Sequence, residues 1–186
     1  MRVLFIFSML VFVSSVGFAQ TNGYDTRTDD IEGIRAIESR AFKGHYLTMD
    51  SRYYHGGNAQ GGGTVNVMNR IGTHQVFKIT KLPDGYYSIA STFFKNRFLR
   101  MDGGQINSSS TAPGGVVNLQ TSVASYEKFK IEKLDDGSYS IESVQFPGRF
   151  LTLNPNPRAK DPNHAGGKVQ VQNRAGGHER FYLLKK

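Results

Sequence analysis

Three residue pairs recur along the chain at a spacing of 52 residues, each combining a planar side chain with an amide or a carboxyl group. A ring of this kind can cover a C–H face of a sugar, and its polar edge and the neighbouring side chain can exchange hydrogen bonds with hydroxyls. We therefore consider these pairs candidate ligand-binding residues. The alternative is that they form solvated turns. The pairs are His74 with Gln75, Tyr126 with Glu127, and His178 with Glu179.

Two further polar sets recur at the same spacing. One ends a predicted strand, where Asp and Asn commonly accept backbone hydrogen bonds and stabilise turns. Ligand binding is its second interpretation. The residues of that set are Asp50, Asp102 and Asn154. The other set alternates with valines on a predicted strand and faces either solvent or a pocket. Its residues are Asn66, Asn118 and Gln170.

Basic side chains recur near the first predicted turn of each repeat. They are Lys43, Lys95, Arg97 and Arg149. A basic vertex that occurs three times could bind sulfate or phosphate groups at several points at once. The alternative is three exposed turns with ordinary charge. The net charge of +8 suits acidic partners but does not distinguish sulfated glycans from nucleic acid or anionic membranes.

Motifs that carry known chemistry are missing from the sequence. There is no Cys, no Gly-x-Ser-x-Gly and no His-Glu-x-x-His, and the five His residues include no His-x-His spacing. The adjacent carboxylates Asp135 and Asp136 lie in a predicted hairpin turn, where neighbouring side chains diverge. We therefore expect a non-catalytic protein without a cofactor or a metal site.

All these positions belong to a threefold internal repeat. Residues 39–79, 91–131 and 143–183 align without a gap. In the second copy, residues 86–91, 97–101, 116–120 and 128–133 alternate as strands do. Asp84-Gly85 and Asp136-Gly137 are hairpin turns that join one copy to the next. The pattern predicts four strands in each copy and twelve in all.

Three four-strand units of this size predict an all-β fold, the β-trefoil, with three pseudo-threefold repeats of 52 residues. In that fold six strands close a barrel and six form a cap of three hairpins, so that sheet edges are removed. A propeller is disfavoured because three blades are too few to surround a channel. We expect three apolar sets to meet in the core. They are Leu47, Leu99 and Leu151; Val65, Val117 and Val169; and Phe77, Phe129 and Phe181.

Several segments resemble known trefoil families. Residues 143–151 resemble the Ser-Val-x-x-Pro-Gly-Arg-Tyr-Leu segment of AbfB-type arabinofuranose-binding modules. Residues 44–48 and 127–131 resemble fascin-like repeats, and residues 74–77 are similar to the Gln-x-Trp element of ricin-type lectins. These resemblances imply a β-trefoil that binds carbohydrate.

The sugar-binding positions of those families differ in this chain. Where ricin-type units place a sugar-binding Asp, the three repeats have Thr48, Arg100 and Thr152. Where AbfB-type units place one, the repeats have His74, Tyr126 and His178. The resemblance therefore implies binding of glycans without implying arabinose or galactose, and the net charge of +8 is what suits sulfated or acidic glycans.

The N-terminus predicts a secretory signal at residues 1–19. Arg2 precedes an apolar run over residues 3–13, and Gly17 and Ala19 are the small residues of a cleavage site. An N-terminal segment then covers residues 20–33 and the trefoil domain residues 34–186, with repeats at about 34–83, 84–135 and 136–186.

We expect a secreted, extracellular monomer with no transmembrane span and no nucleic-acid partner. Asn107 begins an N-glycosylation sequon. Carbohydrate binding through pseudo-threefold sites is the first functional hypothesis. The alternatives are a cytokine-like or protease-inhibitor-like trefoil ligand and a matrix or fascin-like bundling protein.

Overall fold

The computed structural model describes residues 30–52, 54, 60–104, 106, 112–155 and 166–186. The first repeat supplies β1 (Gly33–Ser39), β2 (Tyr46–Asp50), β3 (Thr64–Met68), the 3-10 helix η1 (Thr73–Gln75) and β4 (Phe77–Lys81). The second supplies β5 (Tyr87–Ser91), β6 (Phe98–Asp102), β7 (Val116–Gln120), η2 (Ser125–Glu127) and β8 (Phe129–Lys133). The third supplies β9 (Tyr139–Ser143), β10 (Phe150–Pro155), β11 (Gly167–Gln172) and β12 (Phe181–Lys185).

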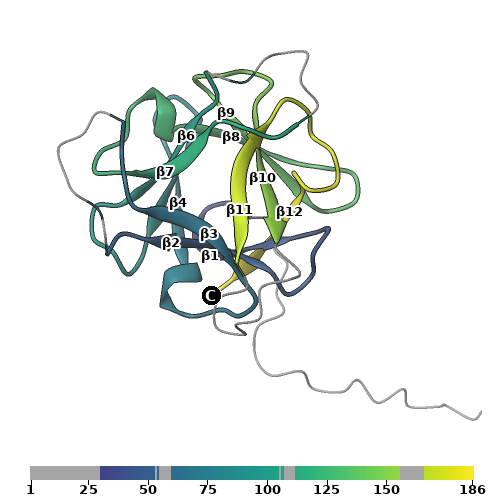
Figure 1. The fold of residues 1–186 in the computed structure, drawn as a ribbon, viewed down its shortest axis with the longest axis horizontal. Coiled ribbons are helices and arrows are strands. Elements are labelled where there is room, and N and C mark those ends of the chain that lie inside the picture. The colour runs from purple at the N-terminus through teal and green to yellow at the C-terminus, as the bar shows by residue number, and fades with distance from the viewer. Residues whose placement is uncertain (1–29, 53, 55–59, 105, 107–111, 156–165) are drawn as a thin grey trace, which may run out of the picture.

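Six of the strands close a barrel. Strand β1 pairs with β4 and β12, β5 with β4 and β8, and β9 with β8 and β12, all antiparallel. The other six form the hairpins β2–β3, β6–β7 and β10–β11. Figure 1 shows these three hairpins arranged around a common centre. The predicted β-trefoil, with its twelve strands, is therefore confirmed.

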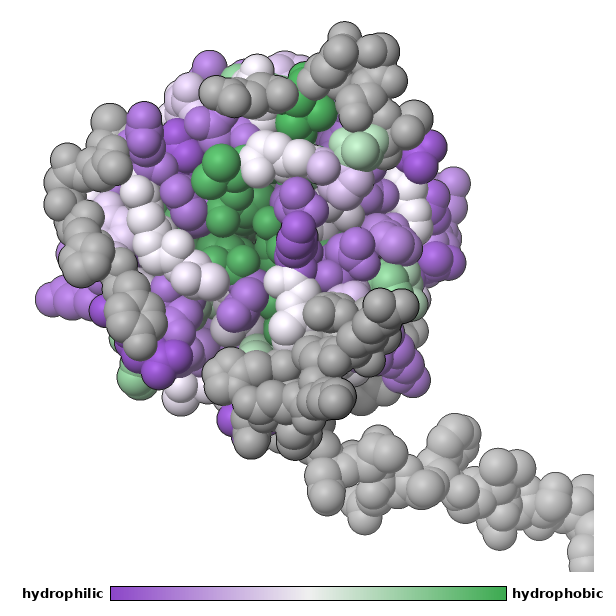
Figure 2. Space-filling view, in the orientation of Figure 1, coloured by the Kyte–Doolittle hydropathy of each residue, from purple (hydrophilic) through white to green (hydrophobic). Residues whose placement is uncertain are grey.

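The predicted core is also present. The three repeated leucines and the three repeated phenylalanines have no exposed surface, and the three valines are 7–9% exposed. They belong to a single hydrophobic cluster. Figure 2 shows hydrophobic residues at the centre of the face that carries the three hairpins, with hydrophilic residues around them. Each repeat thus contributes one apolar side chain to each set, and three repeats are needed to complete the core.

The turns that connect the elements follow from the predicted residues. Gly85 and Gly137 have φ values of 86° and 75°, which suit the Asp-Gly hairpins between β4 and β5 and between β8 and β9. At the entry to β7, a Cβ added to Gly115 would lie only 2.5 Å from the carbonyl oxygen of Asp102. The repeated glycine there allows the two strands of a hairpin to approach closely. None of the helices in the described part of the chain has the length and apolar character to cross a membrane.

Candidate functional site

The first repeat carries an open polar pocket of about 540 Å³ between the hairpin β2–β3 and η1. Its wall comes from the end of β2, the end of β3 with the loop that follows, and η1 itself. Asp50, His74 and Gln75 line it, together with Thr48 and Asn66. The structure therefore brings together the predicted ligand-binding residues of the first repeat.

Gln75 fixes the floor of this pocket. Its amide oxygen accepts the backbone N–H of Gly72 at 2.8 Å, and its amide nitrogen donates to the hydroxyl of Thr48 at 2.9 Å. Gln75 and Thr48 are 5% and 4% exposed, so the solvated-turn interpretation does not hold for this side chain. The other repeats keep the bond to the backbone, in which Ala124 donates to Glu127 and Gly176 to Glu179, each at 2.8 Å.

Asn66 forms part of the wall and is the least satisfied polar residue of the pocket. Its amide oxygen is buried and has no hydrogen-bond partner among the described residues. A buried acceptor without a partner costs about 1–3 kcal/mol, and such groups are rare in folded proteins. Because an amide can turn about its Cβ–Cγ bond, either its oxygen or its nitrogen can meet a group that enters the pocket.

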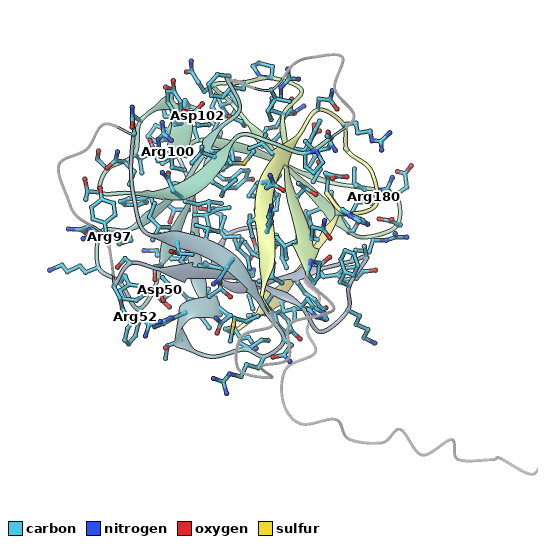
Figure 3. All side chains as sticks on the ribbon, in the orientation of Figure 1. Asp50, Arg52, Arg97, Arg100, Asp102 and Arg180 are labelled. Carbon is cyan, nitrogen blue, oxygen red and sulfur yellow. The ribbon has the colours of Figure 1, made fainter. Side chains whose placement is uncertain are left out.

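Asp50 closes one end of the pocket and supports its turn. It accepts the backbone N–H of Arg52 at 3.0 Å, and Arg52 also pairs with its carboxylate at 2.5 Å (Figure 3). These hydrogen bonds hold the pKa of Asp50 below its ordinary value. In the second repeat Asp102 accepts the N–H of Gly104 at 3.1 Å, which is the turn role expected from the sequence. Asn154 is exposed at the end of β10.

An aromatic rim lies beside the pocket. The ring of His74 lies 5.0 Å from that of Phe93 and 4.8 Å from that of Phe94, both of which come from the second repeat. Phe93 is 56% exposed. The other predicted rings also pack on the repeat that follows them, because Tyr126 contacts Phe146 and His178 contacts Phe42. One role of these rings is therefore to join successive repeats.

In the second repeat, the protein's own arginine fills the equivalent place. Arg100 is 5% exposed and lies on β6, where the other repeats have threonine. Its guanidinium pairs with Asp102 at 3.2 Å and with Glu127 at 3.8 Å, and it lies 4.5 Å from the ring centre of Tyr126 (Figure 3). Burial raises the pKa of Glu127, although Ala124 and Arg100 oppose that shift. The predicted residues of this repeat thus bind an internal cation.

Two residues of the first repeat, Tyr54 and Gln60, bond to the second repeat. The hydroxyl of Tyr54 donates to Gln120 at 2.9 Å, and the side chain of Asn118 donates to the carbonyl of Gln60 at 2.8 Å. A second cavity of about 470 Å³ lies beside these groups and is lined by Arg100, Asp102 and Asn118, among others. Asn118 is thus bonded through its amide nitrogen, whereas its amide oxygen, like that of Asn66, is buried without a partner among the described residues.

In the third repeat the predicted residues divide between interior and surface. Thr152 and Glu179 are 3% and 4% exposed, whereas His178 and Asn154 are exposed. The backbone carbonyl of His178 accepts the N–H of Leu153 at 3.2 Å. This repeat combines threonine with a buried glutamate, where the first combines threonine with a buried glutamine.

We compared the chain with protein families, curated sequences and solved structures. No family model matches the chain, and no curated protein sequence matches it. Solved structures do match, among them a mosquitocidal holotoxin, with a TM-score of 0.62, 18% identity and 84% of this chain covered. The Rhizoctonia solani agglutinin matches with a TM-score of 0.61 and 10% identity, over 87% of this chain and 100% of its own. SeviL bound to the asialo-GM1 saccharide matches with a TM-score of 0.57 and 16% identity, over 83% and 98%.

The chain has the fold of the β-trefoil lectins. It spans 18% of the length of the holotoxin chain, so the match to that toxin concerns one part of it. The likenesses to AbfB-type and fascin-like repeats stay predictions from the sequence.

The basic residues near the first turn of each repeat do not form one kind of site. Lys43 and Lys95 are exposed. Arg97 lies 4.3 Å from the ring centre of Tyr54, and Arg149 donates to the backbone carbonyl of Ile106 at 3.3 Å. The two arginines thus contact Tyr54 and Ile106, which come from the preceding repeat. The predicted sequon at Asn107 and the predicted signal segment lie outside the described residues.

Four side chains in or beside the two pockets were not among the candidate ligand-binding residues of the sequence analysis. They are Arg52, Arg70, Phe93 and Arg100. Arg70 lines the pocket and is exposed in the loop after β3. Arg100 stands out in the sequence, because a charged residue there interrupts a strand position that is threonine in the other repeats. Phe93 could not be identified from the repeat, because the residues of its turn differ between the three copies.

Proposed function

We propose that this β-trefoil is a secreted, non-catalytic carbohydrate-binding protein that holds a saccharide in the pocket of the first repeat. The observation that carries the proposal is a polar pocket in which the amide oxygen of Asn66 has no partner among the described residues, and whose lining residue His74 packs against the exposed ring of Phe93. A volume of about 540 Å³ falls within the range of small-ligand pockets.

The chemistry of the pocket suits a ligand that is polar at its edges and apolar on one face. Asn66 and the imidazole of His74 offer both donors and acceptors to hydroxyl groups. The exposed ring of Phe93 beside His74 offers an apolar surface for C–H groups. Saccharides combine these two features. The structural neighbour SeviL, which is bound to a saccharide, supports the same proposal.

We place the principal site in the first repeat. The sequence suggested up to three weak sites that act together, but Arg100, Tyr54 and Gln60 engage the corresponding groups of the second repeat. Secretion is part of the proposal because residues 1–19 have the charged start, apolar run and small-residue end of a signal peptide.

A glycan array followed by titration of the best-binding glycan tests this function. Asn66→Ala removes hydrogen bonds to the ligand, and we expect it to weaken binding about tenfold. Asn118→Ala is the matched control, because Asn118 occupies the same position in the second repeat, has the same unpartnered amide oxygen, and differs in that its nitrogen already donates to Gln60. Phe93→Ala should weaken binding by about threefold to tenfold through loss of ring contact. An array without any bound glycan, or equal affinity in the Asn66 and Asn118 variants, contradicts the proposal.

A further inference from the structure

We propose that the pocket of the first repeat selects saccharides that carry an anionic group, a carboxylate or a sulfate ester, and that Arg70 binds this group. The inference rests on the proposed function and adds the class of ligand. It starts from an imbalance of charge among the residues that line the pocket.

The charged residues of the pocket are two arginines and one carboxylate. Arg52 pairs with Asp50, through contacts of 2.5 and 3.0 Å, so these two charges compensate each other. Arg70 is exposed, and no described residue gives it a hydrogen bond or an ion pair. The pocket therefore offers one guanidinium that is not neutralised by its surroundings. A guanidinium binds carboxylate and sulfate oxygens with two parallel hydrogen bonds, which gives both strength and orientation.

The floor of the pocket supports the same ligand class. Gln75 is neutral, whereas the equivalent residues Glu127 and Glu179 carry carboxyl groups. All three side chains are buried and accept the same backbone N–H bond. An amide in this place keeps the turn but adds no negative charge beneath a bound anion. The pocket of the first repeat thus has an amide where the other two repeats have a buried carboxyl.

The second repeat shows what an arginine does when anions are supplied by the protein itself. Arg100 is bonded to Asp102 and lies near Glu127, and the place equivalent to Arg70 is Ser122. In the first repeat the arginine lies on the loop, the strand position is threonine, and the buried partner is an amide. The first repeat keeps Asp50 in the place of Asp102, but it pairs with Arg52, and Gln75 replaces the carboxyl of Glu127. The anion that Glu127 supplies in the second repeat therefore comes from a ligand in the first.

The test uses the full mature chain and an array of matched glycan pairs. Each pair differs by one sialic or uronic carboxylate, or by one sulfate ester, so that the two sources of negative charge are separate arms. The best pair of each arm is then titrated at low and high salt. We expect the wild type to prefer the acidic member about tenfold or more, since a charge-assisted hydrogen bond contributes at least that factor. Either arm that shows this preference supports the proposal.

Two substitutions assign the preference to the pocket. Arg70→Gln should lower the ratio of the affinities for the acidic and the neutral member to about one. Gln75→Glu should weaken acidic ligands more than neutral ones, and it should fold because Thr152 and Glu179 already form this combination in the third repeat. Lys81→Gln is the charge-matched control, since Lys81 is exposed at the end of β4 and lies outside the pocket.

The outcomes separate the two proposals. Equal affinity of the wild type for both members of every pair overturns the anionic ligand class and leaves saccharide binding intact. The same loss in the Arg70 and Lys81 variants also overturns it, because the preference would then come from overall charge. Absence of binding to any glycan overturns the proposed function and this inference with it.

Discussion

The first and second repeats of this trefoil have the same backbone frame, which consists of the strand pairing and the 3-10 helix. They differ in whether a side chain of the protein fills the space beside that helix. Strands β2 and β3 pair in the same register as β6 and β7, and η1 and η2 occupy equivalent places. In the first repeat the space beside the 3-10 helix is an open pocket. In the second, Arg100 enters that space from β6 and meets Glu127 and Tyr126.

The difference shows that the frame and the site depend on separate residues. The backbone bond of the 3-10 turn is made by Gln75 and by Glu127 alike, at 2.8 Å in both cases. The open or closed state of the site depends on the strand residue, which is Thr48 or Arg100, and on the neighbouring loop. Exchanging these side chains should therefore exchange the properties of the two repeats and leave the fold in place.

The largest effect should come from Arg100→Thr. Loss of the arginine leaves the carboxyl group of Glu127 buried without its cation and removes the contact with Tyr126. Breaking a buried ion pair from one side costs about 3–5 kcal/mol, and we expect about 3 kcal/mol because Asp102 is partly exposed. Urea denaturation at pH 7 measures the change in the free energy of unfolding.

A double variant is the control for that loss. Arg100→Thr with Glu127→Gln recreates the Thr48–Gln75 pair of the first repeat, and it should regain about 1 kcal/mol or more, because no charge is left buried. A carboxyl whose pKa is raised in the fold binds its proton more tightly there than in the unfolded chain. The loss in the single variant should therefore be smaller near pH 4 than at pH 7. Equal stability of the single and double variants would show that Arg100 does not compensate Glu127.

The converse exchange should close the first repeat. Thr48→Arg with Gln75→Glu gives β2 and η1 the residues of β6 and η2. The new guanidinium should fill the pocket between Asp50 and residue 75, and saccharide affinity should fall at least about tenfold. Titration with the best glycan from the array measures this. Circular dichroism should show an unchanged fold, and a variant that folds and still binds with full affinity would place the site elsewhere.

The sequence was sufficient to predict the frame, because the frame depends on residues that repeat. Leucine, valine and phenylalanine recur every 52 residues, and each set is buried as expected. The Asp-Gly turns form the predicted hairpins. Every repeat must supply the same apolar contacts to one shared core. The 52-residue spacing of the apolar residues therefore predicts the threefold fold.

The open pocket could not be predicted, because it depends on contacts between distant parts of the chain. Tyr54 bonds Gln120 across 66 residues, and Asn118 bonds Gln60 across 58. Their effect is to close the second repeat, and nothing in the local pattern of that repeat indicates it. The candidate pairs were identified by residue type, but burial of Gln75 and Glu127 follows from the turn geometry around η1 and η2.

The smallest effect on stability should come from Asp136→Asn, which removes contacts where the third repeat meets the first. Asp136 accepts hydrogen bonds from the backbone and hydroxyl of Ser138 and pairs with Arg180 at 2.8 Å and Arg40 at 2.9 Å, and these contacts hold its pKa at about 2. A carboxyl with a lowered pKa in the fold stabilises it above its ordinary pKa and loses that contribution as the pH falls towards the folded value. Asp136→Asn should therefore lower stability by about 1 kcal/mol at pH 7, and the difference from wild type should vanish between about pH 5 and pH 2. Asp84→Asn is the comparison, because Asp84 occupies the same position in the second repeat but pairs with Lys128 alone among the charged residues that the structure describes. Thermal unfolding over this pH range should show the smaller effect for Asp84. Both variants should keep full saccharide affinity, because neither Asp84 nor Asp136 lines the pocket of the first repeat.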